Sequence, residues 1–333
     1  MTEQSKINKN GAQRASLLER ADRVFGLDNL GPSKVPSNLP KARKPAVPPK
    51  PAPVLPPVAP TATPATRLPP HSGPQAAPQA APEPQPEPAV ALSGPFHQID
   101  RWDLQEAGLI VPEDPVTALL EEFRIVKRDI IADARSSRDP KQRRILVCSP
   151  HQGEGKTYCA TNLAIALAAE RDVEVLLVDA DVIRPSVADR FGIEAQRGLM
   201  DALADPSLRP EKLAIKTDID GLFVLTAGTT SAHDAEYLAS ERTGEILDRL
   251  TRGAPNRYVI FDTPPALAAS AAAELASHVG QTMLVVRADE TSRAALEDAR
   301  QLLSACPNIK LLLNAAHFSP SGRRFGEYGK GEE

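Results

Sequence analysis

The chain has 333 residues and a formal net charge of −4, which gives no electrostatic reason to expect nucleic acid as a partner. Most of its 33 prolines lie between residues 32 and 95, so the foldable part runs from about residue 112 to 320, long enough for one domain with a full core. The three cysteines, Cys148, Cys159 and Cys306, form neither a metal-ligand spacing nor a disulfide framework, which is typical of a reducing compartment.

The first 28 residues contain a short amphipathic segment. Over residues 13–26, apolar side chains recur on one helical face: Leu17, Leu18, Ala21, Val24 and Phe25. A helix of this length is marginal alone in water, so we expect it to dock on a protein partner, on its own domain or on a membrane surface. Residues 29–95 are rich in Pro and Ala and predict a disordered tether with polyproline character.

The sequence contains no pattern of a membrane span or a signal peptide. It has no run of roughly 18 apolar residues, and no hydrophobic segment follows the polar, charged N-terminus. We therefore expect a cytoplasmic protein, and any association with a membrane is expected to be peripheral.

Residues 96–320 are expected to form one domain, and residues 321–333 a flexible tail. Residues 96–112 are hydrophobic enough to pack against the domain, and a helix is expected over 115–134. Apolar strand-like runs follow at 145–148, 174–178, 222–226, 258–261, 282–286 and 310–313, and helical patterns at 156–170, 234–251, 268–277 and 291–304. Apolar strands separated by helices predict an α/β fold with a mostly parallel sheet and helices on both faces. In such a sheet the ligand site lies at the carboxyl ends of the strands.

The strand at 145–148 leads into a phosphate-binding loop. The turn ends in Gly153-Glu154-Gly155-Lys156-Thr157 and is followed by an alanine-rich helix, although Pro150 stands where the first glycine of this pattern usually lies. Glycines let backbone N–H groups form an anion nest at the positive end of the helix. Lys156 can reach the β- and γ-phosphates, and the Thr157 hydroxyl can bind Mg²⁺. The pattern predicts a P-loop NTPase that binds ATP, with Tyr158 as a further residue of the nucleotide site.

Two more strands end in acidic residues. Asp179 and Asp181 follow the run at 174–178, and Asp262 follows the run at 258–261. A single Asp at such a place also caps helices, but together with the phosphate loop these residues indicate a site for ATP and Mg²⁺. Asn314 ends the last strand, and it either contacts the base or caps a turn.

In these motifs the chain resembles the bacterial tyrosine kinases (BY-kinases) of exopolysaccharide and capsule export, especially the stand-alone autokinases of exosortase-linked systems. The resemblance covers about residues 112–317. It implies a protein-tyrosine autokinase that transfers the γ-phosphate of ATP to a tail tyrosine of a neighbouring subunit and regulates polysaccharide polymerisation and export. It also implies roles for the site residues: Lys156, Asp179 and Asp181 in catalysis, and Thr157, Asp181 and Asp262 at the Mg²⁺, with Asp262 acting through water.

The resemblance extends to assembly. Glu121, Arg124 and Lys127 match the family's Glu-x-x-Arg-x-x-Arg oligomerisation motif, with lysine in the last position; taken alone, the segment is equally typical of a solvated amphipathic helix. The implied partners are further copies in a ring-like homo-oligomer, a membrane-bound polysaccharide co-polymerase that activates the kinase, and a tyrosine phosphatase. The implied location is the cytoplasmic side of the inner membrane, through a partner. The family's tail is rich in tyrosine, whereas this tail has the single acceptor candidate Tyr328.

Two other functions fit the same nucleotide motifs. Positioning ATPases of the ParA/MinD type share this fold, but they carry a signature lysine five residues before the main loop lysine, where this chain has His151. A kinase-silent scaffold that binds ATP as a switch would explain the lone tail tyrosine. The intact Lys156 and Asp262 argue against the loss of nucleotide chemistry, but they do not exclude the loss of phosphotransfer.

Overall fold

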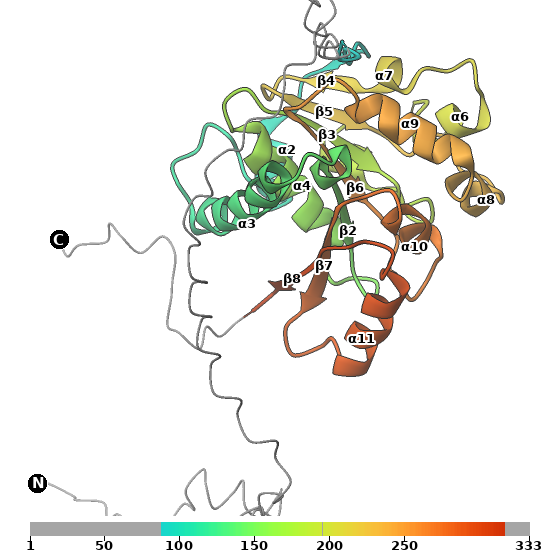
Figure 1. The fold of residues 1–333 in the computed structure, drawn as a ribbon. Helices are drawn as coiled ribbons and strands as arrows, with labels where there is room; N and C mark the ends of the chain where they lie inside the picture. The colour runs from blue at the N-terminus through green and yellow to red at the C-terminus, as the bar shows by residue number, and fades with distance from the viewer. Residues whose placement is uncertain (1–87, 195, 317–333) are drawn as a thin grey trace, which may run out of the picture. The chain divides into compact units, whose positions relative to one another are not determined.

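A computed structural model describes residues 88–194 and 196–316 of the chain (Figure 1). The chain divides into two units, Met1–Pro78 and Gln79–Glu333, and all described residues lie in the second. The helix predicted at 13–26 and the acceptor candidate Tyr328 lie outside the described residues. Within the described part, no helix is both long and apolar enough to cross a membrane.

The described strands form one sheet of eight strands in the order β1-β4-β5-β3-β6-β2-β7-β8. Neighbouring strands are parallel, except that β4 and β5 run antiparallel. The strands are β1 (Phe96–His97), β2 (Arg144–Cys148), β3 (Glu174–Asp179), β4 (Ile215–Thr217), β5 (Leu222–Leu225), β6 (Arg257–Asp262), β7 (Gln281–Arg287) and β8 (Ile309–Asn314). The six predicted strands and the mostly parallel sheet are confirmed. The sequence analysis missed β1 and β4, which have only two and three residues.

Helices cover both faces of the sheet, as predicted (Figure 1). On one face lie α2 (Arg101–Glu106), α3 (Ala118–Ser136), α4 (Lys156–Ala168) and α5 (Val187–Arg190). On the other lie α6 (Leu199–Ala204), α7 (Pro210–Leu213), α8 (Asp234–Leu238), α9 (Glu241–Thr251), α10 (Ala271–Ala276) and α11 (Arg293–Leu302). A short 3-10 helix, η2 (Pro140–Arg143), precedes β2. The single helix predicted at 234–251 is wrong, because Ser240 takes an extended conformation that ends α8 and caps α9.

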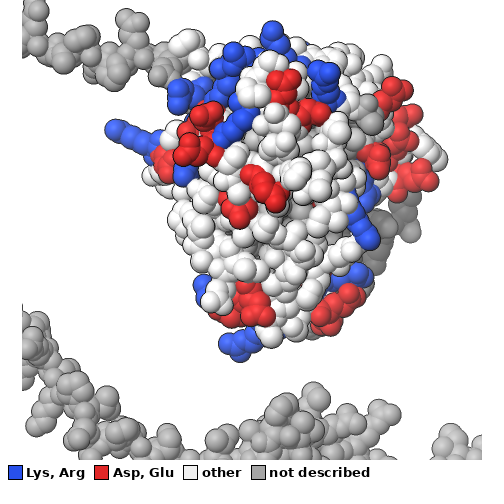
Figure 2. Space-filling view, turned by 90° about the vertical axis from the view of Figure 1, so that its right-hand side faces the viewer, with Lys and Arg blue, Asp and Glu red and all other residues white. Residues whose placement is uncertain are grey.

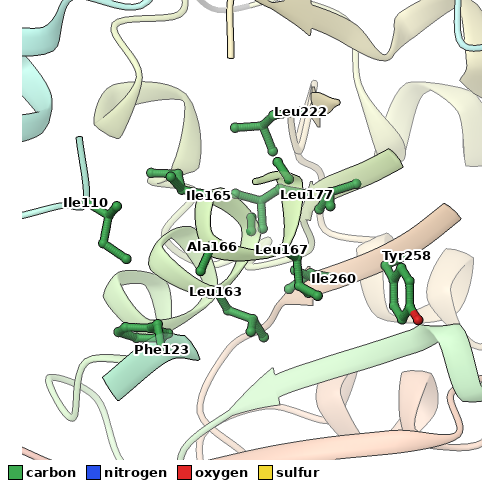
Figure 3. Packing of buried hydrophobic residues seen from close by; sticks show 14 of the residues in the cluster. Ile110, Phe123, Leu163, Ile165, Ala166, Leu167, Leu177, Leu222, Tyr258 and Ile260 are labelled. Atoms are coloured by element: carbon green, nitrogen blue, oxygen red, sulfur yellow. The ribbon is translucent and has the colours of Figure 1, made fainter. Parts of the chain in front are cut away.

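The core explains why the sheet needs cover on both sides. Along β2, Ile145 and Val147 point into the layer with α3 and α4, whereas Leu146 and Cys148 point into the opposite layer. Eleven of the thirteen residues of α4 are buried, and its labelled side chains lie between those of the strands and those of α3 (Figure 3). Because α4 is packed on all sides, the loop at its N-terminal end has a rigid support.

The segment before α3 packs against the domain, as predicted. Ile99, Leu104, Leu109 and Ile110 are buried, and the Ile110 N–H donates a hydrogen bond of 2.8 Å to Oδ1 of Asn162 on α4. Two aromatic residues of the same segment are not part of this packing, since Phe96 is 64% exposed and Trp102 is 69% exposed. The segment therefore extends the core of the domain through its aliphatic residues.

Figure 2 shows the side of the domain that carries α6, α8, α9 and α10. Basic side chains gather mainly along the upper edge of this face, and acidic ones lie at its centre and toward its right-hand edge (Figure 2). One ion pair of this region joins Arg249 on α9 to Glu211 on α7 at 2.5 Å.

Candidate nucleotide site

The carboxyl ends of three neighbouring strands build the site. In the sheet, β6 lies between β3 and β2, and its last residue, Asp262, pairs in register with Asp179 on one side and Val147 on the other. The phosphate loop leaves β2 immediately after this point. The strand order therefore brings the two acidic motifs and the phosphate loop to one edge of the sheet, as the sequence predicted.

The loop has the backbone of an anion nest. Gly153 and Gly155 have φ of 82° and 96°, a left-handed conformation that glycine adopts without a steric penalty. Gly155 is the N-cap of α4 and has no side chain to cap it. The first N–H groups of α4 thus face the loop, where a phosphate can accept their hydrogen bonds.

Lys156 is held by one of the predicted carboxylates. Its Nζ lies 2.7 Å from Oδ2 of Asp181, and the two side chains are 13% and 2% exposed. The other oxygen of Asp181 accepts a hydrogen bond from the Arg184 N–H at 3.0 Å. The buried pair fixes the lysine beside the loop, and a phosphate that enters the nest would compete with Asp181 for the ammonium group.

Thr157 and Asp262 form a second contact. The Thr157 hydroxyl donates to Oδ2 of Asp262 at 2.6 Å, while Oδ1 of Asp262 is buried without a hydrogen-bond partner among the described residues. Burial raises the pKa of Asp262 to about 7, although the nearby Lys156 charge opposes this shift. A desolvated carboxylate oxygen next to a threonine hydroxyl fits a Mg²⁺ ion.

The donor set also suits Mg²⁺ in another respect. In the described part of the chain, no group of three or more His, Cys, Asp or Glu side chains could hold a metal ion. Mg²⁺ commonly keeps several waters and uses one or two carboxylates together with substrate phosphates, rather than a cage of protein ligands. Thr157 and Asp262 therefore fit an ion that arrives with the nucleotide.

Asp179 mainly holds the acidic loop together. Its carboxylate accepts hydrogen bonds from the backbone N–H groups of Asp181, Ser186 and Val187, at 3.2, 2.9 and 2.9 Å. Burial raises the pKa of Asp179 to about 6 despite these bonds. The bonds bring Ser186 to 3.4 Å from the Thr157 hydroxyl, a contact that the sequence analysis missed. The catalytic role predicted for Asp179 stays a prediction.

The remaining predicted site residues differ in position. The Asn314 side-chain amide donates to the Glu154 carbonyl at 2.8 Å, so both residues belong to the phosphate loop and its support. Tyr158, in the first turn of α4, is half-buried and packs against the hydrophobic core. Its contribution to ATP binding stays a prediction, as does a contact of Asn314 with the base.

The three motif residues of α3 point in two directions. Glu121 and Arg124 form an ion pair within the helix and are partly exposed. Lys127 is buried, and its Nζ donates to the Ala166 carbonyl at 2.9 Å and lies 2.8 Å from Glu170. Lys127 thus bonds within its own domain, at the C-terminal end of α4. The role of the three residues in oligomerisation stays a prediction.

Comparisons with known proteins give the chain its family. A family model described as an AAA domain matches residues 142–316, more than half of the chain. The tyrosine-protein kinase YwqD of Bacillus subtilis is 29% identical over 232 residues, which cover 69% of this chain and 94% of that relative. The putative tyrosine-protein kinase EpsB of Ralstonia nicotianae is 30% identical over 66% of this chain, but the match spans only 28% of EpsB.

Solved structures agree on the fold. The crystal structure of the chimerical protein CapA2B2 superposes with a TM-score of 0.53, at 24% identity, and covers 68% of this chain and 94% of that one. At this identity the likeness is evidence for the fold alone. The assignment to a family rests on the sequence matches. The chain belongs to the AAA domain family, in the group of the bacterial tyrosine kinases.

Proposed function

We propose that the protein is an ATP-dependent protein-tyrosine autokinase of an exopolysaccharide or capsule export system, of the stand-alone kind found with exosortase systems. One observation carries the proposal. Lys156 contacts Asp181 and Thr157 contacts Asp262 at the carboxyl edge of the sheet, in a chain whose relatives are named tyrosine-protein kinases. A lysine-bearing phosphate loop beside two acidic motifs is what phosphoryl transfer requires.

The proposed reaction is an in-line transfer. The tyrosine oxygen forms a bond to the γ-phosphorus while the bond between that phosphorus and the leaving oxygen of ADP breaks. Lys156 moves its contact from Asp181 to the phosphates and neutralises their charge. Asp181, released from the lysine, accepts the proton of the tyrosine hydroxyl. Bound Mg²⁺ supplies further neutralisation of the phosphate charge, and Thr157 and Asp262 are the residues that would hold it.

The proposed acceptor and partners rest on the family resemblance. Tyr328 in the tail of one subunit is the acceptor for its neighbour in a ring-like homo-oligomer, which Glu121 and Arg124 on the surface of α3 help to form. A membrane-bound polysaccharide co-polymerase activates the kinase, and a tyrosine phosphatase reverses the reaction. The protein then works on the cytoplasmic side of the inner membrane through its partner.

Phosphate mapping tests the proposal. The full chain is incubated with Mg-ATP and analysed by mass spectrometry beside Lys156→Ala and Tyr328→Phe. We expect phosphotyrosine at position 328 that is absent from both variants. Transfer that only Lys156→Ala abolishes would keep the kinase and move the acceptor to another residue. Formation of ADP without phosphotyrosine, even with a membrane activator present, would replace the kinase with an ATPase switch.

A further inference from the structure

Glu154 is the only residue of the segment 153–155 that has a side chain. Its neighbours, Gly153 and Gly155, are both left-handed, and glycine is the residue with the greatest backbone freedom. A Cβ at position 155 would overlap the side-chain amide of Asn314, so that position excludes larger residues. The rest of the domain can therefore fix this part of the loop only through Glu154 or through its backbone.

The carboxylate of Glu154 is fixed from two sides. It accepts a hydrogen bond of 2.7 Å from the His151 N–H, within the loop, and another from the Thr291 hydroxyl, outside the loop. The Thr291 hydroxyl in turn accepts a hydrogen bond of 2.8 Å from the Arg287 N–H at the end of β7. Glu154 is only 5% exposed. A buried carboxylate that loses one of these donors would be poorly solvated, which makes the contact with Thr291 valuable.

The backbone of Glu154 is fixed by a different strand. Its carbonyl accepts a hydrogen bond of 2.8 Å from Asn314, the last residue of β8. Asn314 and Arg287 are paired in register at the ends of β8 and β7. The turn after β7 thus supplies one contact to the Glu154 side chain through Thr291, and the end of the edge strand β8 supplies one to the Glu154 carbonyl through Asn314.

We propose that Thr291 is a positioning residue for nucleotide binding, and that it acts through the Glu154 carboxylate, with Asn314 as the second support. Without the Thr291 hydroxyl, the segment between the two left-handed glycines gains conformational freedom that phosphate binding must then remove. The inference rests on the ATP-binding part of the proposed function and does not depend on phosphotransfer. The side-chain hydrogen bonds of Thr291 within the described residues are with Glu154 and Arg287, not with Lys156 or the aspartates of the site, so its effect is indirect.

The affinity of the full chain for Mg-ATP, measured by isothermal titration calorimetry, tests this role. Thr291→Val keeps the shape of the side chain and removes the hydroxyl, and we expect a Kd on the order of tenfold higher. Thr291→Ser restores the hydroxyl and is expected to restore the Kd to within about twofold of wild type. Rescue by serine would separate the hydrogen bond from the packing of the threonine methyl group.

Ser292→Ala is the matched control. The Ser292 hydroxyl caps α11 by accepting a hydrogen bond of 3.1 Å from the Ala295 N–H, and among the described residues it makes no hydrogen bond to Glu154. Loss of this cap lowers the melting temperature but is expected to leave the Kd for Mg-ATP unchanged. An equal rise in Kd for Ser292→Ala and Thr291→Val would mean that general loosening of the loop is responsible, and it would overturn the proposal.

A double-mutant cycle tests the route of the effect. If Thr291 acts through Glu154, Thr291→Val added to Glu154→Ala causes little further loss of affinity. Losses of affinity that add up in the double variant would contradict the inference. A Kd for Thr291→Val within twofold of wild type would also contradict it, as would a wild-type chain that binds no Mg-ATP. A chain that binds Mg-ATP but transfers no phosphate would refute the kinase and leave the role of Thr291 to be decided by the same Kd values.

Discussion

The two edges of the sheet treat buried charge in opposite ways. At the amino edge, the guanidinium of Arg144 is 2% exposed and bonds to Thr251, to the His278 carbonyl and to Asp248. At the carboxyl edge, Asp262 is equally buried, yet one of its oxygens has no partner among the described residues and its pKa is raised. Arg144 is thus fully bonded within the fold, whereas Asp262 keeps one oxygen available for a ligand, although Arg143 Nε and Gln281 Oε1 at the amino edge are also buried without partners among the described residues.

The second buried arginine of the amino edge follows the same rule. Arg257, the first residue of β6, is bonded to Glu174, to the Leu250 carbonyl and to the Val90 carbonyl. The same strand ends in Asp262, so one strand carries a fully partnered charge at its start and a partly unpartnered one at its end. The two ends of β6 therefore differ in how completely their buried charged side chains are bonded.

The largest expected effect is on stability, at the amino edge. Arg144→Ala removes the donor to the His278 carbonyl and to the Thr251 hydroxyl, which keeps only its bond to the Leu247 carbonyl and to its own helix, and it creates a cavity, so we expect the free energy of unfolding in urea to fall by about 3 kcal/mol. Because Arg144 lies at the far end of β2 from the phosphate loop, the Kd for Mg-ATP, measured well below the unfolding transition, is expected to stay within about twofold. A large change in Kd would mean that the two edges are coupled.

The opposite result is expected at the carboxyl edge. Asp262→Asn removes a desolvated charge, so we expect the nucleotide-free protein to become more stable by about 1–2 kcal/mol at pH 7.5. The same change removes a carboxylate from the Mg²⁺ position, and the rise in melting temperature that Mg-ATP gives the wild type should be largely lost. A destabilised variant that still gains stability from Mg-ATP would show that Asp262 is a structural residue.

The pKa of Asp262 adds a pH dependence to this prediction. The carboxyl group has a pKa of about 7 in the folded protein, above its usual value near 4 in an unfolded chain. Between these values the folded state binds more protons than the unfolded state, so the contribution of Asp262 to stability falls as the pH rises from 4 to 7. Urea unfolding of the nucleotide-free protein from pH 4 to 7 should show that the free energy of unfolding falls more steeply with pH in the wild type than in Asp262→Asn. Parallel curves for the two proteins would contradict the assignment.

The sequence predicted the strands and the main residues of the site better than it predicted the residues that hold the phosphate loop in place. Apolar runs of four or five residues located six strands, and their order along the chain placed Lys156, Asp179 and Asp262 at one edge. The antiparallel strand β4 was missed because three residues carry too little periodicity, and the break at Ser240 lies in a pattern that is helical on both sides. Thr291 was not predicted because its role depends on a contact with Glu154, a residue 137 positions earlier in the chain.

Lys127 shows a different limit of sequence analysis. Its spacing from Glu121 and Arg124 matches a motif, but spacing on a helix does not decide which side chain turns inward. In the structure, the long side chain of Lys127 reaches the last turn of α4, where a lysine can bond a free carbonyl. Only the packing of α3 on α4 determines that direction, and packing is a tertiary property.

The smallest expected effect is a change in the Kd for Mg-ATP, tested at two asparagines that lie at opposite ends of β8. Asn314 ends β8 at the carboxyl edge and holds the Glu154 carbonyl, whereas Asn308 precedes β8 at the amino edge and donates to Asp133. Asn314→Ala removes one hydrogen bond to the phosphate loop, so we expect the Kd for Mg-ATP to rise about fivefold. Asn308→Ala removes a hydrogen bond of similar kind far from the loop, so we expect no change in this Kd.

A second nucleotide decides how Asn314 acts. If it supports the loop, Asn314→Ala weakens the binding of Mg-ATP and Mg-GTP by the same factor, because the loop binds the phosphates that both nucleotides share. If its amide forms a hydrogen bond to the base, the ratio of the Kd values for Mg-ATP and Mg-GTP changes instead, since only one of the two bases loses a matching hydrogen bond. Calorimetry on wild type, Asn314→Ala and Asn308→Ala with both nucleotides separates these cases. An equal loss for the two asparagine variants would contradict the distinction between the two edges, because the amino edge would then contribute to the nucleotide site as strongly as the carboxyl edge.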